Sequence, residues 1–239
     1  MTTAIFIKTC KKDLEWLHYC LRSIWKFGSG FEELVIVADE DCRSMIDGWI
    51  EASWKTSIVY VENPKHGYFH MQAVKLMADT YTSCDNILFV DSDCVFYTPF
   101  TPYSFMRDGK PILIKTKYET LAKCPKGKDA LCWKKPTERI VNLQVEWEYM
   151  RRIPMMFSRH IYSKIRERYP EAQEFARNLP GFGGFSEFNL MGAWIDIYDP
   201  DSHFITDSEA WSPSPVAKQY WSWGGFSRVI IDEIEGYLK

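Results

Sequence analysis

Residues 87–96 have the sequence ILFVDSDCVF. The first four are apolar, and this run predicts a strand buried on both faces, as in the middle of a parallel sheet. Two carboxylates, Asp91 and Asp93, then interrupt the apolar run. Because a buried carboxylate without a partner is very unfavourable, we expect both to be paired, hydrogen-bonded or bound to a cation.

The position of the two aspartates indicates a binding site. In open α/β sheets, ligands bind at the carboxyl ends of the strands. If the backbone stays extended there, its period of two places Asp91 and Asp93 on the same side. Two carboxylates on one side predict a site for Mg²⁺ or Mn²⁺ that bridges phosphate oxygens.

The chain before residue 87 alternates short apolar runs with amphipathic helical patterns. Strands are expected at 4–7, 34–38 and 57–61, and helices at 14–24, 45–50 and 67–81. This order favours parallel strands joined by right-handed crossovers. The sequence therefore predicts an α/β, Rossmann-like fold with a mixed, mostly parallel sheet flanked by helices.

In the third of these helices, Met71, Val74, Met77, Ala78 and Tyr81 are expected to form the buried face. Two polar residues, Gln72 and Lys75, lie three apart and share another face, so they can act on one ligand. A solvated face is the alternative interpretation.

The second half predicts helices over a small extra sheet. Strands are expected at 110–114 and 154–157, with Ser158 as the N-cap of a following helix. The lysine-rich stretch 115–136 is expected to be a mobile, solvated loop, and a lid over phosphates or a contact to an anionic acceptor is the alternative. Residues 180–185 predict a flexible elbow, and 229–238 a final amphipathic helix.

Two features of this half are candidates for ligand contact. Ser186 and Glu187 follow the elbow at a helix start, where they either contact a ligand or cap the helix and favour its dipole. The aromatic tail offers faces suited to the apolar side of a sugar, although tryptophan clusters also form cores. The acceptor candidates are Trp194, Trp211 and Trp221.

Composition limits the classes of protein. The chain has 239 residues, of which 46% are hydrophobic, so it can bury a large core. Its net charge of −3 gives no general attraction to nucleic acid or to an anionic membrane. There is no signal-peptide pattern and no apolar run long enough to span a membrane, so we expect a cytoplasmic protein.

The cysteines are odd in number and form no CxxC, which argues against a disulfide framework. Cys124 and Cys132 alone bracket a loop that could be closed by a disulfide or could hold a metal.

Several blocks together resemble the nucleotide-sugar glycosyltransferases of GT-A fold, whose signature is an apolar strand ending in Asp-x-Asp. The blocks are 9–24, 67–76, the strand ending in Asp91-Ser92-Asp93, and 186–189. They are similar to the successive blocks of a family of bacterial and viral GT-A-like proteins over roughly residues 4–195. The chain departs from that family at His70-Met71, where Tyr-Gln is more usual, and at Phe188-Asn189, where Tyr-Glu is commoner. The second departure leaves the acceptor contacts open.

The resemblance implies one GT-A-like domain over 1–239, in which 1–100 bind the nucleotide sugar and 101–239 form the smaller acceptor side. It implies a UDP-linked donor, and it assigns donor contacts to Thr9, Asp13, Asp39, Gln72, Lys75, Asp91 and Ser92.

The resemblance also implies a divalent cation, Mn²⁺ or Mg²⁺. Asp93 would ligate it directly, Asp91 would bind the ribose or complete the metal shell, and His203 would be a further ligand. Glu187 would be the base of an inverting enzyme. In a retaining enzyme, Glu187 or Asn189 would position the acceptor or stabilise the developing cation.

Two other functions fit parts of the sequence. A phosphatase of haloacid dehalogenase type would use Asp91 as nucleophile and Asp93 as acid and base, although its motif normally lies on the first strand. A non-catalytic binder of sugars or nucleotides would have the same fold but would catalyse no reaction. For a transferase, the acceptor is a surface glycan or a hydroxymethylated base of viral DNA, the latter suggested by the basic stretch 115–135.

Overall fold

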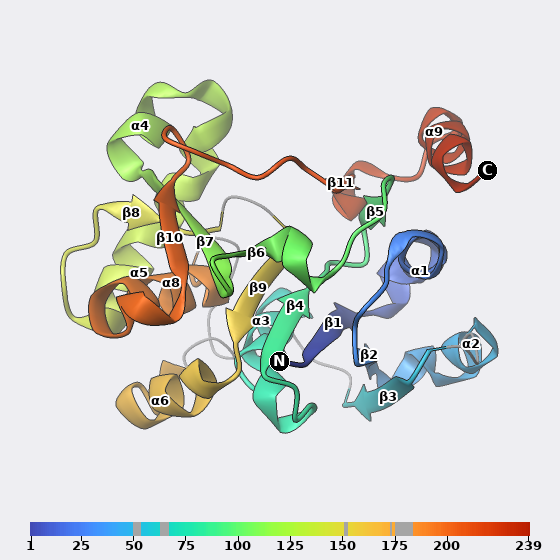
Figure 1. Ribbon diagram of the computed structural model, residues 1–239, viewed down its shortest axis with the longest axis horizontal. Coiled ribbons are helices and arrows are strands. Elements are labelled where there is room, and N and C mark those ends of the chain that lie inside the picture. Colours follow the sequence, from blue (N-terminus) through green and yellow to red (C-terminus); the bar gives the residue numbers. More distant parts are fainter. Residues whose placement is uncertain (50–53, 63–66, 151–152, 173, 175–183) are drawn as a thin grey trace.

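The computed structural model describes residues 1–49, 54–62, 67–150, 153–172, 174 and 184–239. Its largest sheet has five strands in the order β3-β2-β1-β4-β9 (Figure 1). Their bounds are β1 Thr3–Thr9, β2 Glu33–Asp39, β3 Thr56–Val61, β4 Asn86–Phe89 and β9 Met155–Ser158. The first four strands run parallel and β9 is antiparallel to β4. The expected mixed, mostly parallel sheet is confirmed.

Helices cover both faces of this sheet. The described helices are α1 Leu14–Phe27, α2 Arg43–Ile46, α3 Gly67–Lys75, α4 Tyr118–Lys123, α5 Lys134–Val141, α6 His160–Arg168, α8 Glu187–Tyr198 and α9 Arg228–Leu238. Of these, α9 packs on α1, and α4 packs on β7 and the 3-10 helix that follows it. Alternate strand residues face opposite cores, because side chains alternate along a strand. Phe6 and Phe89 pack with residues of α3, α5, α6 and α8, whereas Ile5 and Leu88 pack with residues of α1 and α2.

The remaining strands form two smaller sheets. One has the order β10-β7-β6, with β8 also paired to β7. Its strands are β6 Met106–Arg107, β7 Lys110–Lys117, β8 Trp147–Glu148 and β10 Phe204–Asp207. In the other, β11 Ala217–Gln219 runs antiparallel to β5 Cys94–Phe96. The tail of the chain is thereby brought beside the segment that follows Asp93.

The structure corrects several sequence predictions. The stretch 115–136 is not a loop: after β7 it forms α4, the 3-10 helix Pro125–Trp133 and the start of α5. Its apolar residues explain this, because Tyr118, Leu121 and Trp133 are buried. Ser158 ends β9, and Arg159 is the residue that precedes α6.

Helix boundaries also differ. The helix expected at 45–50 is a short α2 followed by the 3-10 turn Asp47–Trp49, and residue 50 lies outside the described residues. Helix α3 ends at Lys75, and a separate 3-10 turn follows at Ala78–Thr80. Its fully buried residues include Gln72 and Lys75, so the solvated-face alternative is wrong. Most of the elbow, 180–183, lies outside the described residues, whereas the final helix α9 is confirmed.

The described residues contain no helix that is both long and apolar enough to cross a membrane.

One contact in the fold gives a prediction of stability. A Cβ atom at Gly192 in α8 would overlap the side chain of Tyr149, whereas a Cβ at Gly236 in α9 would meet nothing within 4 Å. We expect Gly192→Ala to lower the free energy of unfolding by about 1–3 kcal/mol through overpacking. Gly236→Ala should instead raise it by about 0.5–1 kcal/mol, because alanine favours a helix interior. Urea denaturation measures both, and shifts of the same sign would contradict the prediction.

Candidate functional site

A cavity of about 710 Å³ lies where β1, β2 and β4 end. Most of the predicted site residues line it, although they come from distant parts of the chain. They are Thr9, Asp13, Asp39, Gln72, Lys75, Asp91, Ser92, Asp93, Glu187 and Trp221. Their convergence follows from the parallel order of the strands, whose carboxyl ends meet at one edge of the sheet.

The two aspartates converge by a different route from the one expected. The backbone turns at residues 92–93, and the Cys94 amide donates to the Asp91 carbonyl at 2.9 Å. The Gln219 amide Nε2 donates both to Asp91 Oδ2 at 3.2 Å and to Asp93 Oδ1 at 3.3 Å. The Ser222 amide donates to Asp93 Oδ2 at 2.8 Å. Two carboxylate oxygens from different residues therefore point at one atom supplied by the tail.

The environment of Asp93 disfavours its negative charge. Burial and the neighbouring Asp91 carboxylate raise the pKa of Asp93 to about 6, against the opposing effect of its hydrogen bonds to Ser222 and Gln219. Such a carboxylate pair gains from a nearby positive charge.

The aspartate pair fits a divalent cation. Hard oxygen ligands suit Mg²⁺ and Mn²⁺, which are often held by one or two carboxylates together with phosphate oxygens and water. Asp91 Oδ2 and Asp93 Oδ1 already point at a common donor, Gln219 Nε2, which would have to withdraw. No group of three or more His, Cys, Asp or Glu that could hold a metal occurs among the described residues. The chain would thus supply two carboxylates, and the rest of the shell would come from the bound phosphates and water.

Lys75 joins the aspartates to Glu187. Its side chain is 2% exposed, and its Nζ lies 2.8 Å from Asp91 Oδ1 and 3.3 Å from Glu187 Oε1. Although burial opposes the lysine charge, the two carboxylates raise the pKa of Lys75 above its ordinary value. Burial raises the pKa of Glu187, and Lys75 opposes that rise. A buried cation therefore couples the aspartate pair to a carboxyl group of raised pKa.

Gln72 fixes the start of the helix that carries Glu187. Its Oε1 accepts a hydrogen bond from the Glu187 amide at 3.1 Å. The expected N-cap role of Ser186 is also observed, because its Oγ accepts from the Asn189 amide at 3.3 Å. The Nε2 of Gln72 is buried and has no hydrogen-bond partner among the residues that the structure describes. It is a donor that a ligand in the cavity can use.

Another part of the cavity lining contains a second buried ion pair. Lys8 Nζ donates to Asp39 Oδ1 and to the Thr9 carbonyl, both at 2.6 Å. The hydroxyls of Thr9 and Ser92 are buried and have no partner within the described parts of the chain. This wall offers a carboxylate and free hydroxyls to a polar ligand.

His203 does not join the aspartates. It is 3% exposed, its Nε2 accepts from the Ser158 amide at 3.4 Å, and its Nδ1 lies 2.7 Å from Ser202 Oγ. Ser158 pairs with Asn86 at the start of β4, whereas Asp91 follows the end of β4. Burial lowers the pKa of His203 to about 3. The prediction that it completes the metal site is corrected: it is a neutral, hydrogen-bonded core residue.

Asn189 is likewise a structural residue. It is fully buried and does not line the cavity. Its Oδ1 accepts from the Tyr149 amide at 2.9 Å, and its Nδ2 donates to Ser186 Oγ at 3.0 Å and to Glu148 Oε1 at 3.3 Å. With these contacts its amide holds β8 to α8, so the predicted catalytic role is corrected.

The structure places the three tryptophans that were acceptor candidates in different surroundings. Trp194 is buried against Tyr198 in the core, and Trp211 packs edge-on against Phe204 in the smaller sheet. Neither lines the cavity, so the structure does not bring these two acceptor candidates to the aspartates. Trp221 does line it and is 51% exposed.

Several residues of the site were not predicted. The most important are Gln219 and Ser222, which contact the aspartates, and Lys8, which neutralises Asp39. The signal in the sequence was weak: Gln219 and Ser222 flank Trp221 in the aromatic tail, but nothing in that pattern connects them to Asp93. Trp223, Trp133 and Met150 add apolar surface to the same cavity.

Cation binding at this site should depend on pH. Asp93, with a pKa of about 6, is mostly protonated at pH 5 and mostly ionised at pH 7. We expect the affinity for MnCl₂ to fall by about tenfold from pH 7 to pH 5, because the cation needs the ionised carboxylate. Calorimetric titration at several pH values measures this, and Asp93→Asn should bind MnCl₂ at pH 7 no more tightly than the unmodified protein does at pH 5. Equal affinities at pH 5 and pH 7 in the unmodified protein would contradict it.

No model of a known protein family matches the chain, and no curated protein matches it either.

Proposed function

We propose that the protein is a divalent-cation-dependent glycosyltransferase of GT-A fold. It transfers a sugar from a nucleoside diphosphate sugar, UDP-linked in the first instance, to a hydroxyl acceptor. The observation that carries the proposal is the convergence of Asp91 and Asp93, at the end of a central strand, with Lys75 and the buried Glu187 beside them. The resemblance of the sequence blocks supports the same class.

The donor would lie across the ends of β1, β2 and β4. Asp39 and the free hydroxyl of Thr9 suit the hydroxyls of a ribose, and Asp13 lies on the same wall. Asp91 and Asp93 would hold the cation, which, when bound, stabilises the negative charge that develops on the departing diphosphate. Ser92 and Gln72 offer polar groups that have no partner among the described residues. These suit the phosphates and the sugar hydroxyls.

Glu187 is the candidate base. As the acceptor oxygen bonds to the anomeric carbon, the bond from that carbon to the diphosphate oxygen breaks, and the acceptor proton moves to the Glu187 carboxylate. A raised pKa suits this step, because a base works best when its pKa lies near the working pH. In a retaining enzyme the same carboxylate, held by Lys75, would position the acceptor instead.

Lys75 would set the charge of this arrangement. It pairs with both Asp91 and Glu187, and so places one positive charge between two neighbouring carboxyl groups. The burial of Lys75 excludes it from bulk water, so its charge acts on the site with little screening.

The proposal is tested by calorimetric titration with UDP, GDP, CDP and their sugar conjugates, each with and without MnCl₂. We expect one nucleotide to bind in a Mn²⁺-dependent manner, and Asp93→Ala to lose that binding. Asp201→Ala, which removes an exposed aspartate outside the cavity, is the matched control and should bind as the unmodified protein does.

Other outcomes identify other functions. If Asp93→Ala binds the nucleotide and Mn²⁺ as tightly as the unmodified protein, the proposal fails. Phosphate release from a simple aryl phosphate, lost in Asp91→Asn, would support the phosphatase. Tight donor binding with neither hydrolysis nor transfer across a broad set of acceptors would support a non-catalytic binder.

A further inference from the structure

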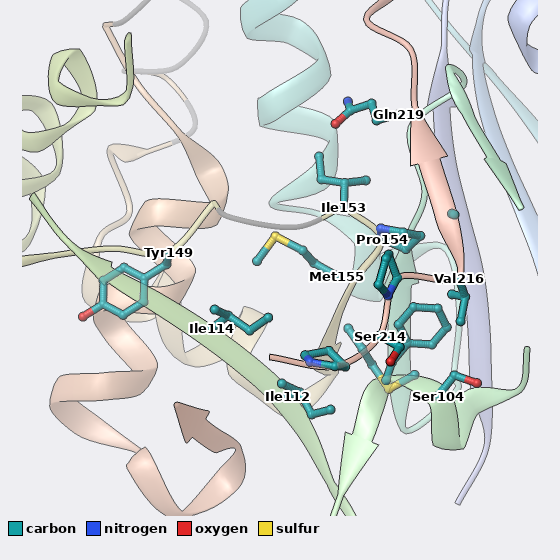
Figure 2. Close-up of a pocket in the computed structure, with 15 residues that line it drawn as sticks. Ser104, Ile112, Ile114, Tyr149, Ile153, Pro154, Met155, Ser214, Val216 and Gln219 are labelled. Carbon is teal, nitrogen blue, oxygen red and sulfur yellow. The ribbon is translucent and has the colours of Figure 1, made fainter. Parts of the chain in front are cut away.

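A second cavity, of about 370 Å³, lies beside the aspartate site. It is formed between β7, the start of β9, the residues just before and within β11, and the 3-10 turn Pro102–Phe105 (Figure 2). Its volume falls within the range of small-molecule sites, about 300–1,000 Å³.

The wall of this cavity differs from that of the first. Its described lining residues include no charged side chain and are mainly aliphatic or proline. Figure 2 shows Ile112, Ile114, Ile153, Met155 and Val216 around it. The first cavity, by contrast, is lined by lysine, aspartate and glutamate side chains from five separate parts of the chain. The two cavities therefore favour different chemical groups.

Gln219 lies at the boundary between them. It is the last residue of β11 and lines both cavities. Its Nε2 contacts Asp91 and Asp93, while Figure 2 shows its side chain above Ile153 at one end of the apolar cavity. Two consecutive residues also line different cavities, Tyr149 the apolar one and Met150 the charged one. The cavities adjoin along this boundary.

We propose that the second cavity binds the apolar part of the acceptor, an uncharged aliphatic or aromatic group that carries the hydroxyl to be glycosylated. This inference rests on the proposed transferase function. If the donor fills the charged cavity, the acceptor must approach from a neighbouring space, and the apolar cavity adjoins the aspartates at Gln219. Aliphatic walls gain from excluding water, about 25 cal/mol for each Å² of apolar surface buried.

The charges argue against a nucleic acid as the occupant. Binding to DNA depends on lysine and arginine contacts to phosphates, and none lines this cavity among the described residues. The lysines of the 115–136 stretch are partly engaged elsewhere: Lys115 pairs with Asp196 at 2.7 Å, and Lys123 with Glu119 at 2.7 Å. An uncharged apolar acceptor fits the observed wall better.

The test uses a series of n-alkyl β-D-glucosides from methyl to octyl, each below its critical micelle concentration, titrated calorimetrically without nucleotide. We expect the affinity to rise about three- to fourfold for each methylene added, until the cavity is full. Ala217→Phe places a ring on the lining of the cavity and should reduce the affinity for octyl glucoside at least tenfold. Ala122→Phe makes the same change at an exposed position outside both cavities and should leave the series unchanged.

If Ala217→Phe fails to fold, Ser214→Phe provides a second blocking variant, because Ser214 lines the cavity at an exposed position. An affinity that does not vary with chain length, or that varies equally in the blocked variants, overturns the inference. So does salt-sensitive binding of duplex DNA that the blocking variants abolish.

The nucleotide titrations separate this result from the proposed function. Nucleotide binding without chain-length dependence overturns only the apolar acceptor. Chain-length dependence without binding of any nucleotide overturns the transferase and, with it, the acceptor role of the cavity.

Discussion

Replacing Lys75 by Met is expected to lower the free energy of unfolding by about 3–5 kcal/mol at pH 7, because it leaves the buried Glu187 and the partly buried Asp91 without their cation. Lys75 lies between Asp91 and Glu187, and its side chain is almost inaccessible to water. Methionine has a similar length but no charge. The pKa of Lys75 is raised in the folded protein, so its contribution is fully present at pH 7 and is lost only at strongly alkaline pH. Urea denaturation at pH 7 measures the change.

Two control variants test whether the loss of stability comes from the ion pairs of Lys75. The double variant Lys75→Met/Glu187→Gln removes one of the stranded charges and should recover part of the lost stability. Lys123→Met removes an exposed lysine that pairs with Glu119, and it should leave the free energy of unfolding nearly unchanged, because solvent screens that pair. A loss below about 1 kcal/mol in Lys75→Met would show that the buried ion pairs contribute little.

Replacing Glu187 by Gln is expected to reduce kcat by about 10²- to 10⁴-fold, the range typical of a general base. The substitution keeps the size of the side chain and removes its ability to take a proton. Donor affinity should change much less than kcat, because in the proposed site Asp91 and Asp93, and not Glu187, would hold the cation. Steady-state kinetics with the nucleotide sugar found by calorimetry measures the effect.

The pH profile separates a base from a structural residue. Burial raises the pKa of Glu187, so the rate should increase as pH rises through that pKa, where the carboxylate becomes ionised. Glu187→Gln should lack this limb of the profile. Glu146→Gln, at an exposed position outside the cavity, should keep both the limb and the rate. If the limb persists in Glu187→Gln, another group is the base.

The central sheet could be predicted because its signals are local. Each parallel strand is a short apolar run, and the residues expected at 34–38 agree with β2 to within one residue at each end. The aspartate site was likewise predictable, since two carboxylates after a buried strand are costly without a ligand or partner. Gln72 and Lys75 were identified by their spacing on one helix.

The errors have a common physical cause. Whether a polar residue is buried depends on contacts made by distant parts of the chain, which local patterns do not contain. His203 follows a polar stretch and Asn189 lies between Phe188 and Leu190, yet both were expected at the site, whereas tertiary packing buries both away from it. The lysine-rich stretch 115–136 was expected to be solvated because of its charge. Its buried Tyr118 and Trp133 instead hold it as helix against the core.

Gln219 is the clearest example of a site residue that local sequence patterns do not reveal. Its role follows from the pairing of β11 with β5, which places Gln219 opposite Cys94. The residues 208–216, between β10 and β11, give no signal of that pairing. The link between the tail and the aspartates could only be learned from the structure.

The contact between Ser222 and Asp93 joins residues that are 129 positions apart in the chain. During synthesis from the N-terminus, the parallel strands and both aspartates are complete long before the tail is made. Until the tail arrives, Lys75 can pair with Asp91, and water takes the places of Gln219 and Ser222 at the two carboxylates. The donors from Gln219 and Ser222 are then the last parts of the site to be added, so the sheet can form before the cost of enclosing two like charges arises. A chain that ends before Gln219 would keep the strands of the main sheet and leave its charged edge open to solvent.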